Sequence, residues 1–420
     1  MPQIITHDLV KTFRVAEREP GRAGAELDSG RDAGVHWTTG DKQMPLRITM
    51  ETQLQEETIQ IAENIRSLKP YHPGHPIEEV QRQYGLTSII KLASNENALG
   101  PSPRAVKAMQ AACTRVGLYP DGACFDLKQA LSRHLDVSPE MIAIGNGSDE
   151  LIQYLGLAFL QPGDEVIQAE PTFVRYEAAA TLGKARLIRV PLRNYTHDLD
   201  AMAEAFSERT RLVFIANPNN PTGTMNTNRE VGRFLERMPS RAILVLDEAY
   251  REYVEDPDYP DAVSLIRSGA NVIALRTFSK IYGLAGLRIG YGIARPQIIS
   301  FLNQVREPFN VNLIAQAGAL ASLEDPDQVQ RSRDMNRAGM KFLTAEFKDM
   351  GLCDIPSVAN FIMVDVNRPS ERVAQALESR GVIIRPGANL GLPTFIRVTI
   401  GTAEECHRFA ETLREVLSQS

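Results

Sequence analysis

Short apolar runs alternate with helical patterns through the middle of this chain, and this alternation constrains its fold most strongly. The runs lie at residues 141–144, 164–168, 186–190, 212–216, 242–246 and 272–276. Between the first two runs, Ile152, Leu155 and Phe159 recur at helical spacing. Strands that alternate with helices form parallel sheets, because a parallel connection has to cross over the sheet. The sequence therefore predicts an α/β fold, a three-layer sandwich with a mostly parallel central sheet.

The pattern changes after about residue 330. A helical pattern at residues 329–350 precedes strand-like runs at 361–366, 382–385 and 395–400. A closing helix is expected to bury its apolar face, which comprises Cys406, Phe409, Ala410, Leu413 and Leu417. These elements predict a small C-terminal α+β domain.

We expect the following division of the chain. Residues 1–50 form an appendage, residues 51–85 the N-terminal arm of the small domain, residues 86–328 the large domain and residues 329–420 the C-terminal small domain. The appendage lacks sustained periodicity, so we expect it to be disordered or to result from an over-long gene prediction. In the arm, Ile61, Ile65 and Leu68 mark one face of a helix that ends before Pro70.

Charge and composition exclude several classes of partner. The 46 Lys and Arg residues against 52 Asp and Glu residues give a net charge of -6, which does not attract nucleic acid or an anionic membrane. No apolar run approaches the roughly 18 residues of a membrane span, and the charged N-terminus does not match a signal peptide. The four cysteines lack zinc spacing, so no metal site is expected. We therefore expect a cytoplasmic protein that acts on small molecules.

A polar turn follows the first apolar run, where an open α/β sheet binds its ligands. The turn reads Gly145-Asn-Gly-Ser-Asp-Glu150. Its final glutamate occupies the position of the third glycine in a dinucleotide-binding fingerprint, which argues against that cofactor. The turn is compatible with a phosphate site at a helix N-terminus or with an ordinary strand-to-helix connection.

An acid and a lysine follow two later runs. Asp247 follows the fifth run and Lys280 the sixth. This pair meets the needs of pyridoxal 5'-phosphate, because the amine bonds the cofactor's aldehyde and the acid keeps its ring nitrogen protonated. Tyr250 and Asn220 are available for the cofactor's phenolate oxygen, and Arg288 for its phosphate.

Several separated motifs resemble those of the fold-type-I aminotransferases. They are Asn220-Pro-Thr-Gly223, Asp247-x-x-Tyr250, Ser279-Lys280 and Gly286-Leu-Arg288-Ile-Gly290. The match runs from roughly Ile61 to the C-terminus, and it implies that residues 86–328 bind pyridoxal phosphate. Within the family, the chain is most similar to the histidinol-phosphate aminotransferases. That narrower resemblance is carried by Tyr71-x-Pro-Gly, Leu92-Ala-Ser-Asn-Glu-Asn97, Tyr119-Pro-Asp121, Gly147-Ser-Asp-Glu150, Pro171-Thr-Phe173, Arg385-Pro and Arg397-Val-Thr-Ile-Gly-Thr402.

The resemblance also implies roles for residues that bind the cofactor. The phosphate would be held by Ser148, Asp149, Ser279 and Arg288. Phe173 would stack on the cofactor ring, where the family often has tyrosine. Tyr119 would reach the phosphate in the other subunit, which implies a homodimer with shared active sites.

Further residues would bind the substrates. Arg397 would grip glutamate's α-carboxylate in one half-reaction and the substrate phosphate in the other. Arg385 and Tyr71 would help with that phosphate, and Asn360 is an additional candidate. A surface salt bridge is the alternative interpretation of Arg385.

The activity implied is a ping-pong amino transfer in L-histidine biosynthesis. It converts glutamate to 2-oxoglutarate and imidazole acetol phosphate to histidinol phosphate, with Lys280 as the general base. An aromatic amino-acid aminotransferase would share the cofactor residues and is the first alternative. Remoter alternatives are a threonine-phosphate decarboxylase and a transcriptional regulator with an aminotransferase-like domain. The regulator would need a DNA-binding module, which residues 1–50 are too short and too aperiodic to form.

Overall fold

A seven-stranded sheet forms the centre of the computed structural model, which describes residues 60–66, 68, 70 and 74–419. Its spatial order is β2 (Ile142–Gly145), β8 (Gly290–Ala294), β7 (Val272–Thr277), β6 (Ile243–Asp247), β5 (Thr210–Ala216), β3 (Glu165–Glu170) and β4 (Arg186–Pro191). Only β8 runs antiparallel to its neighbours β2 and β7. The predicted strands and the mostly parallel sheet are confirmed. The sequence did not reveal β8, because its glycines interrupt the apolar run.

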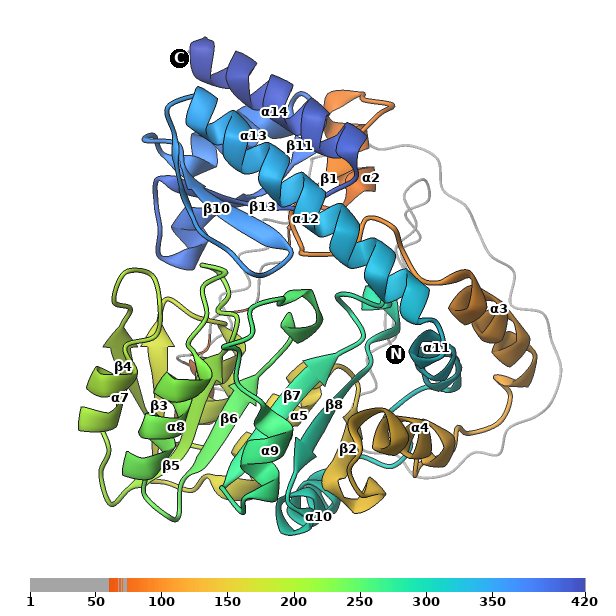
Figure 1. Cartoon of the computed structure of the whole chain (residues 1–420), viewed down its shortest axis with the longest axis vertical. Helices are drawn as coiled ribbons and strands as arrows, with labels where there is room; N and C mark the ends of the chain where they lie inside the picture. Colours follow the sequence, from red (N-terminus) through yellow and green to blue (C-terminus); the bar gives the residue numbers. More distant parts are fainter. Residues whose placement is uncertain (1–59, 67, 69, 71–73, 420) are drawn as a thin grey trace, which may run out of the picture. The chain divides into compact units, whose positions relative to one another are not determined.

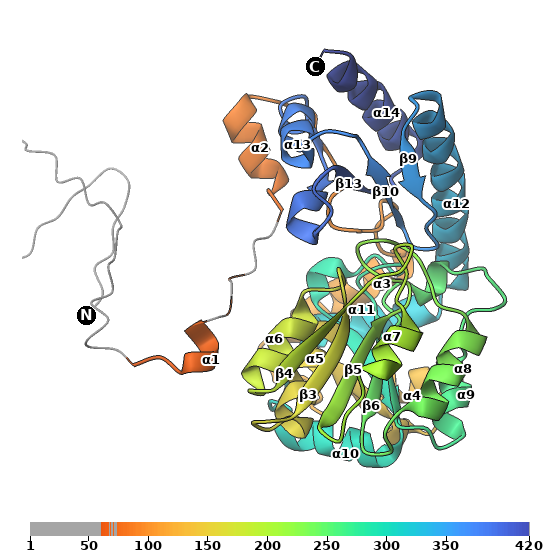
Figure 2. The same ribbon diagram turned by 90° about the vertical axis from the view of Figure 1, so that its left-hand side faces the viewer.

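Helices cover both faces of this sheet. One face packs against α5 (Ser148–Phe159), α6 (Arg175–Leu182) and α10 (Pro296–Val305). The other packs against α3 (Pro103–Ala112), α4 (Phe125–Leu135), α7 (Leu199–Glu204), α8 (Asn228–Arg237), α9 (Ala262–Arg267) and α11 (Leu313–Leu323). Figure 2 shows α5 and α6 across the strands from α8 and α9. The predicted three-layer sandwich is confirmed.

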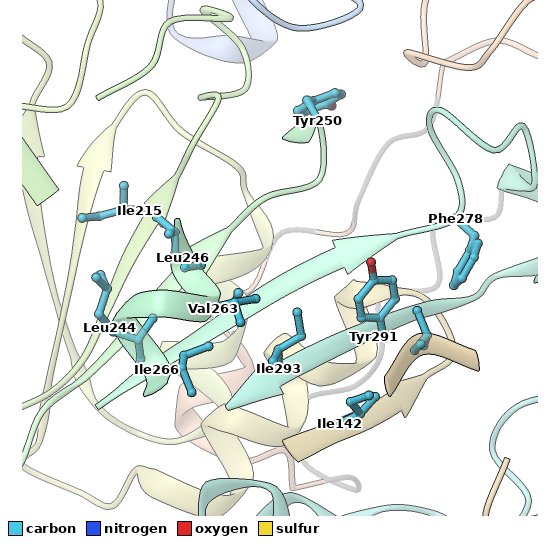
Figure 3. Close-up of a cluster of buried hydrophobic side chains, with 14 of the residues drawn as sticks. Ile142, Ile215, Leu244, Leu246, Tyr250, Val263, Ile266, Phe278, Tyr291 and Ile293 are labelled. Carbon is cyan, nitrogen blue, oxygen red and sulfur yellow. The ribbon is translucent and has the colours of Figure 1, made fainter. Parts of the chain in front are cut away.

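An apolar core fills the space between the sheet and the second group of helices (Figure 3). Leu244 and Leu246 of β6 pack there with Ile266 of α9, because a strand covered on both faces buries every side chain. Tyr250 and Phe278, which follow β6 and β7, belong to the same cluster. The core therefore anchors the segments that leave these two strands.

A second, smaller sheet lies in the C-terminal part of the chain (Figure 1). It is antiparallel, in the order β12 (Arg385–Pro386), β13 (Phe395–Thr399), β10 (Phe361–Asp365) and β9 (Cys353–Ile355). Its helices are α12 (Pro326–Asp349), α13 (Ser370–Glu378) and α14 (Ala403–Ser418). The predicted small α+β region is confirmed, including the burial of Cys406, Phe409 and Leu413.

One expected strand of this region is wrong. The run at residues 382–385 divides into β11 (Val382–Ile383) and β12, which pair in separate sheets. The chain changes sheets inside a continuous buried run, so the apolar pattern does not mark the break. β11 pairs in parallel with β1 (Ile90–Lys91), and this pairing joins the segment before residue 95 to the C-terminal region.

The N-terminal side is described in part. α1 (Glu63–Arg66) and α2 (Ile77–Tyr84) precede β1, and α1 stands where a helix was predicted to end before Pro70. The predictions for residues 1–50 and for Tyr71 lie outside the described residues, and the predicted domain boundaries stay predictions. In the described part of the chain, no helix has both the length and the apolar character that crossing a membrane requires.

Candidate active site

Asp247 ends β6, and its carboxylate is buried at the carboxyl edge of the sheet. The Tyr176 hydroxyl donates to Asp247 Oδ2 at 2.8 Å, and the Ala249 amide donates to Oδ1 at 3.2 Å. Burial raises the pKa of Asp247 to about 6, and the nearby carboxylate of Asp149 adds to the increase. No cationic side chain of the described residues forms an ion pair with Asp247. This setting suits a ligand that brings its own positive charge.

Lys280 lies in the segment after β7, near Asp247. Its Nζ donates to the carbonyl oxygen of Ser94 at 3.2 Å and lies 5.6 Å from the centre of the Tyr250 ring. Burial lowers the pKa of Lys280 to about 8, and the positive charge of Arg397 lowers it further. A sizeable fraction of the amine is therefore neutral near pH 8 and able to act as a nucleophile or base.

An anion-binding cradle forms where α5 begins. Gly147 precedes the helix with a φ of 83°, and a Cβ at this position would lie 2.8 Å from Nη2 of Arg288. Arg288 Nη1 donates to the Ser279 hydroxyl at 3.3 Å. The amides of Ser148 and Asp149 are free of helix partners because they begin the helix. The arginine, the serine and the helix N-terminus provide the donors that a phosphate needs.

The other predicted cofactor residues occupy different positions around this edge. The Asp149 carboxylate pairs with Arg175 Nε at 2.8 Å, so the predicted phosphate contact would have to come from its backbone amide. The Phe173 ring lies edge-on to Tyr176 at 5.6 Å. Tyr119 is 82% exposed and stacks on Phe309 of its own chain.

Arg397, on β13 of the small sheet, contacts the segments that follow β5 and β1. Its Nη1 donates to Oδ1 of Asn220 at 2.6 Å, and its Nη2 donates to the Ala93 carbonyl at 2.9 Å. The guanidinium is buried and lies 5.3 Å from the centre of the Phe361 ring. These contacts bring two predicted site residues, 177 positions apart, into direct contact.

Arg385 stands opposite Arg397 in the register of β12 and β13. Its side chain is close to Gly74, where a Cβ would lie 3.7 Å from Arg385 Nη1. Asn360 is buried, and its amide donates to the carbonyls of Asn95 and Glu96 at 3.1 and 3.4 Å. Through these hydrogen bonds, Asn360 holds the backbone at Asn95 and Glu96 in place. Its role in substrate binding stays a prediction.

Sequence reasoning missed Tyr176 and Asn95, which contact Asp247 and Tyr250 respectively. Tyr176 stands three residues after Phe173, so helical spacing offered a weak signal for it. Asn95 lies inside a motif quoted for the resemblance, but its contact with Tyr250 spans 155 positions. No local pattern encodes such a contact.

The sheet edge thus combines an amine with a lowered pKa, a buried carboxylate and a phosphate cradle. A family model described as aminotransferase class I and II matches residues 87–413. The chain therefore belongs to the class I and II aminotransferase family.

Individual relatives narrow the comparison. The chain is 53% identical over 357 residues to the histidinol-phosphate aminotransferase of Moorella thermoacetica. The match covers 85% of this chain and 92% of the relative. It is 46% identical to the histidinol-phosphate aminotransferase of Caldicellulosiruptor saccharolyticus, over 84% of this chain and 99% of the relative. A crystal structure of the histidinol-phosphate aminotransferase from Sinorhizobium meliloti, in complex with pyridoxal 5'-phosphate, superposes with a TM-score of 0.79 at 32% identity. That match covers 86% of this chain and 98% of the other.

Proposed function

We propose that this chain is a histidinol-phosphate transaminase of L-histidine biosynthesis that uses pyridoxal 5'-phosphate. It passes the amino group of L-glutamate to imidazole acetol phosphate and releases 2-oxoglutarate and L-histidinol phosphate. The observation that carries the substrate assignment is the cross-strand pair of Arg385 and Arg397, of which Arg397 is close enough to Lys280 to lower its pKa. The two relatives quoted above support it over nearly their whole lengths.

The residues present fit the cofactor. Asp247, buried without a cationic partner among the described residues, suits a protonated ring nitrogen. The cradle of Ser148, Ser279 and Arg288 suits a phosphate, and Gly147 keeps a Cβ out of the space that Arg288 occupies. When bound, pyridoxal phosphate supplies an aldehyde for amines and a ring that takes up the electron pair left on the substrate's α-carbon.

The chain's own groups then handle charge and protons. Arg397 holds the α-carboxylate of glutamate through its planar fork, and Asn220 holds Arg397 in place. Lys280, neutral in part because burial lowers its pKa, removes the proton from the substrate's α-carbon. Asp247 retains the proton on the ring nitrogen. Arg385 adds a positive charge for the phosphate of the larger substrate.

We also propose a homodimer in which Tyr119 serves the partner's site, in the cytoplasm as expected of a biosynthetic enzyme. In support, Val116, Leu118, Tyr119 and Phe125 expose apolar surface in one short stretch. Hybrid dimers test this arrangement. Tyr119→Ala and Lys280→Ala chains should each be inactive alone, but mixing them should restore a fraction of the activity, because one site then has both residues. Failure to restore activity would contradict a shared site.

Spectroscopy of the cofactor-loaded enzyme tests the function. Histidinol phosphate should change the cofactor absorbance in a single turnover much faster than phenylalanine does. Arg385→Gln should lower kcat/KM for histidinol phosphate by about 10- to 100-fold, the loss expected for a charge-assisted bond, and should affect glutamate less. Preference for phenylalanine would instead identify an aromatic aminotransferase, and absence of a cofactor band would contradict the whole proposal.

A further inference from the structure

Consecutive residues of one segment contact an arginine, the lysine and a tyrosine of the site in turn. The Ala93 carbonyl accepts from Arg397 Nη2 at 2.9 Å, and the Ser94 carbonyl accepts from Lys280 Nζ at 3.2 Å. The amide nitrogen of the Asn95 side chain donates to the Tyr250 hydroxyl oxygen at 2.9 Å. In these three contacts, Ala93 and Ser94 use their backbone carbonyls, whereas Asn95 uses its side chain.

The orientation of the Asn95 amide follows from its contacts with Thr399. The Asn95 backbone amide donates to Thr399 Oγ1 at 2.9 Å, and Thr399 Oγ1 donates to Asn95 Oδ1 at 3.2 Å. The hydroxyl of Thr399 thus holds the amide oxygen, which turns the amide nitrogen toward Tyr250. Asn95 is 1% exposed and has a φ of 56°, a left-handed conformation that asparagine tolerates better than most residues.

The direction of this hydrogen bond determines where the tyrosine proton points. An amide nitrogen only donates, so the Tyr250 oxygen must be the acceptor. The hydroxyl proton of Tyr250 therefore cannot point at Asn95. Thr399 and Arg397 occupy alternate positions of β13 and share a face, so the same strand carries the carboxylate-binding arginine and the hydroxyl that orients Asn95.

We propose that Asn95 is a positioning residue that reserves the Tyr250 hydroxyl proton for the ring oxygen of the cofactor. This inference rests on the proposed function. A donor at the ring oxygen stabilises negative charge there and lowers the pKa that governs the absorbance of the bound cofactor. Asn95 acts on this pKa through Tyr250 and does not itself touch the cofactor.

The test compares Asn95→Asp with Asn95→Ala in the cofactor-loaded enzyme. A carboxylate accepts the Tyr250 proton and reverses the hydrogen bond, so Asn95→Asp should raise the absorbance midpoint by about one pH unit. Asn95→Ala removes the amide without offering an acceptor to the Tyr250 proton, so its shift should be smaller. Asn95→Ala should lower the melting temperature more than Asn95→Asp does, because alanine tolerates the left-handed backbone less well than aspartate. If Asn95 had a purely structural role, Asn95→Ala would cause both the larger shift of the absorbance midpoint and the larger loss of melting temperature.

Two further variants separate the hydrogen bond from other causes. In a Tyr250→Phe background, Asn95→Asp should shift the midpoint little, whereas a direct effect of the new charge would persist. Asn336→Ala removes a buried hydrogen bond from a different asparagine amide, to the Ala359 carbonyl, so it should lower the melting temperature without moving the midpoint. If Asn95→Asp does not fold, Thr399→Val supplies the test, because a released amide can turn its oxygen to Tyr250 and raise the midpoint.

The outcomes are distinguishable. A larger shift for aspartate than for alanine, lost in the Tyr250→Phe background, supports the inference. An equal or larger shift for alanine, or a shift that persists without the hydroxyl, overturns it while leaving the proposed function intact. Absence of a cofactor band in the unchanged protein overturns the proposed function and this inference with it.

Discussion

Asp247 and Glu248 are neighbours in the sequence and both are buried, yet their carboxylates have different electrostatic surroundings. Asp247 accepts a hydrogen bond from Tyr176 and has no ion-pair partner among the described residues. Glu248 pairs with Nε of Arg276 at 2.8 Å, where the two side chains are 0% and 11% exposed. The Asp247 carboxylate therefore lies at the candidate site without a counter-charge among the described residues, whereas the Glu248 carboxylate is neutralised by Arg276.

The two surroundings have opposite effects on charge: the site favours the neutral forms of its groups, whereas the ion pair favours the charged form of Arg276. On the site side, burial raises the pKa of Asp247 to about 6 and lowers that of Lys280 to about 8, so both groups are pushed toward neutrality. In the pair, the negative charge of Glu248 raises the pKa of Arg276 despite its burial. A buried charge left without an internal partner destabilises the fold, and enzymes retain such groups where a ligand completes them. This contrast distinguishes Asp247, the proposed functional carboxylate, from Glu248, the structural one.

The largest expected effect is on the site side. Lys280→Ala should reduce turnover by at least about 1,000-fold, because the variant lacks the amine that we propose as general base and nucleophile. The protein should stay folded and still bind the cofactor noncovalently. Steady-state kinetics and a cofactor-binding titration measure both properties, and wild-type turnover in this variant would refute the assignment.

The next largest effect should be on stability. Glu248→Gln removes the ion-pair partner of the buried Arg276 and should lower the free energy of unfolding by about 3–5 kcal/mol. The double variant Glu248→Leu with Arg276→Met removes both charges and should cost much less. Urea unfolding of both variants compares them. A single substitution that costs less than the double one would break the contrast between the two carboxylates.

Asp247→Asn should have the opposite effect on the cofactor-free protein. The folded pKa of about 6 lies above the ordinary value of 3.8, so ionisation of Asp247 destabilises the fold as pH rises from about 4 to 6. At pH 7.5 the variant should therefore be more stable than the unchanged protein by up to about 3 kcal/mol. The gain should vanish near pH 4.

Loading the cofactor should reverse this order, because Asp247 then has a positive partner. Calorimetry with and without pyridoxal phosphate at both pH values measures the change. If Asp247→Asn destabilises the cofactor-free protein at pH 7.5, the carboxylate is a structural group like Glu248.

His197 allows a further test, on a buried titratable group that stays neutral in the folded protein. Its Nε2 lies 3.2 Å from Oδ1 of Asn219, and burial lowers its pKa to about 4. The unfolded chain takes up a proton near pH 6.5 that the folded chain refuses, so stability should rise with pH between about 4 and 6.5. His197→Gln should remove up to about 3 kcal/mol of the change in stability across this pH range. An unchanged slope would assign the pH dependence to other groups.

Much of the site could be predicted because it follows buried strands. Asp247 ends an apolar run and Lys280 follows another, and both reach the same sheet edge since the strands are parallel. The surroundings of these residues could not be predicted in the same way. Tyr176 reaches Asp247 across 71 positions, and Thr399 reaches Asn95 across 304. Such contacts depend on how the elements pack, which local patterns do not specify.

The sequence by itself determined the α/β layers and the residues at the strand ends, because the periodicity of apolar side chains fixes which elements form and which faces they bury. Tertiary structure alone decided which charges are partnered. Glu248 pairs with Arg276 only because β6 and β7 are neighbours, and Asn95 contacts both Thr399 and Tyr250 only because the folded chain brings these three distant residues together. Burial and distance set the energy of a charge or a hydrogen bond, and both arise only when distant segments meet.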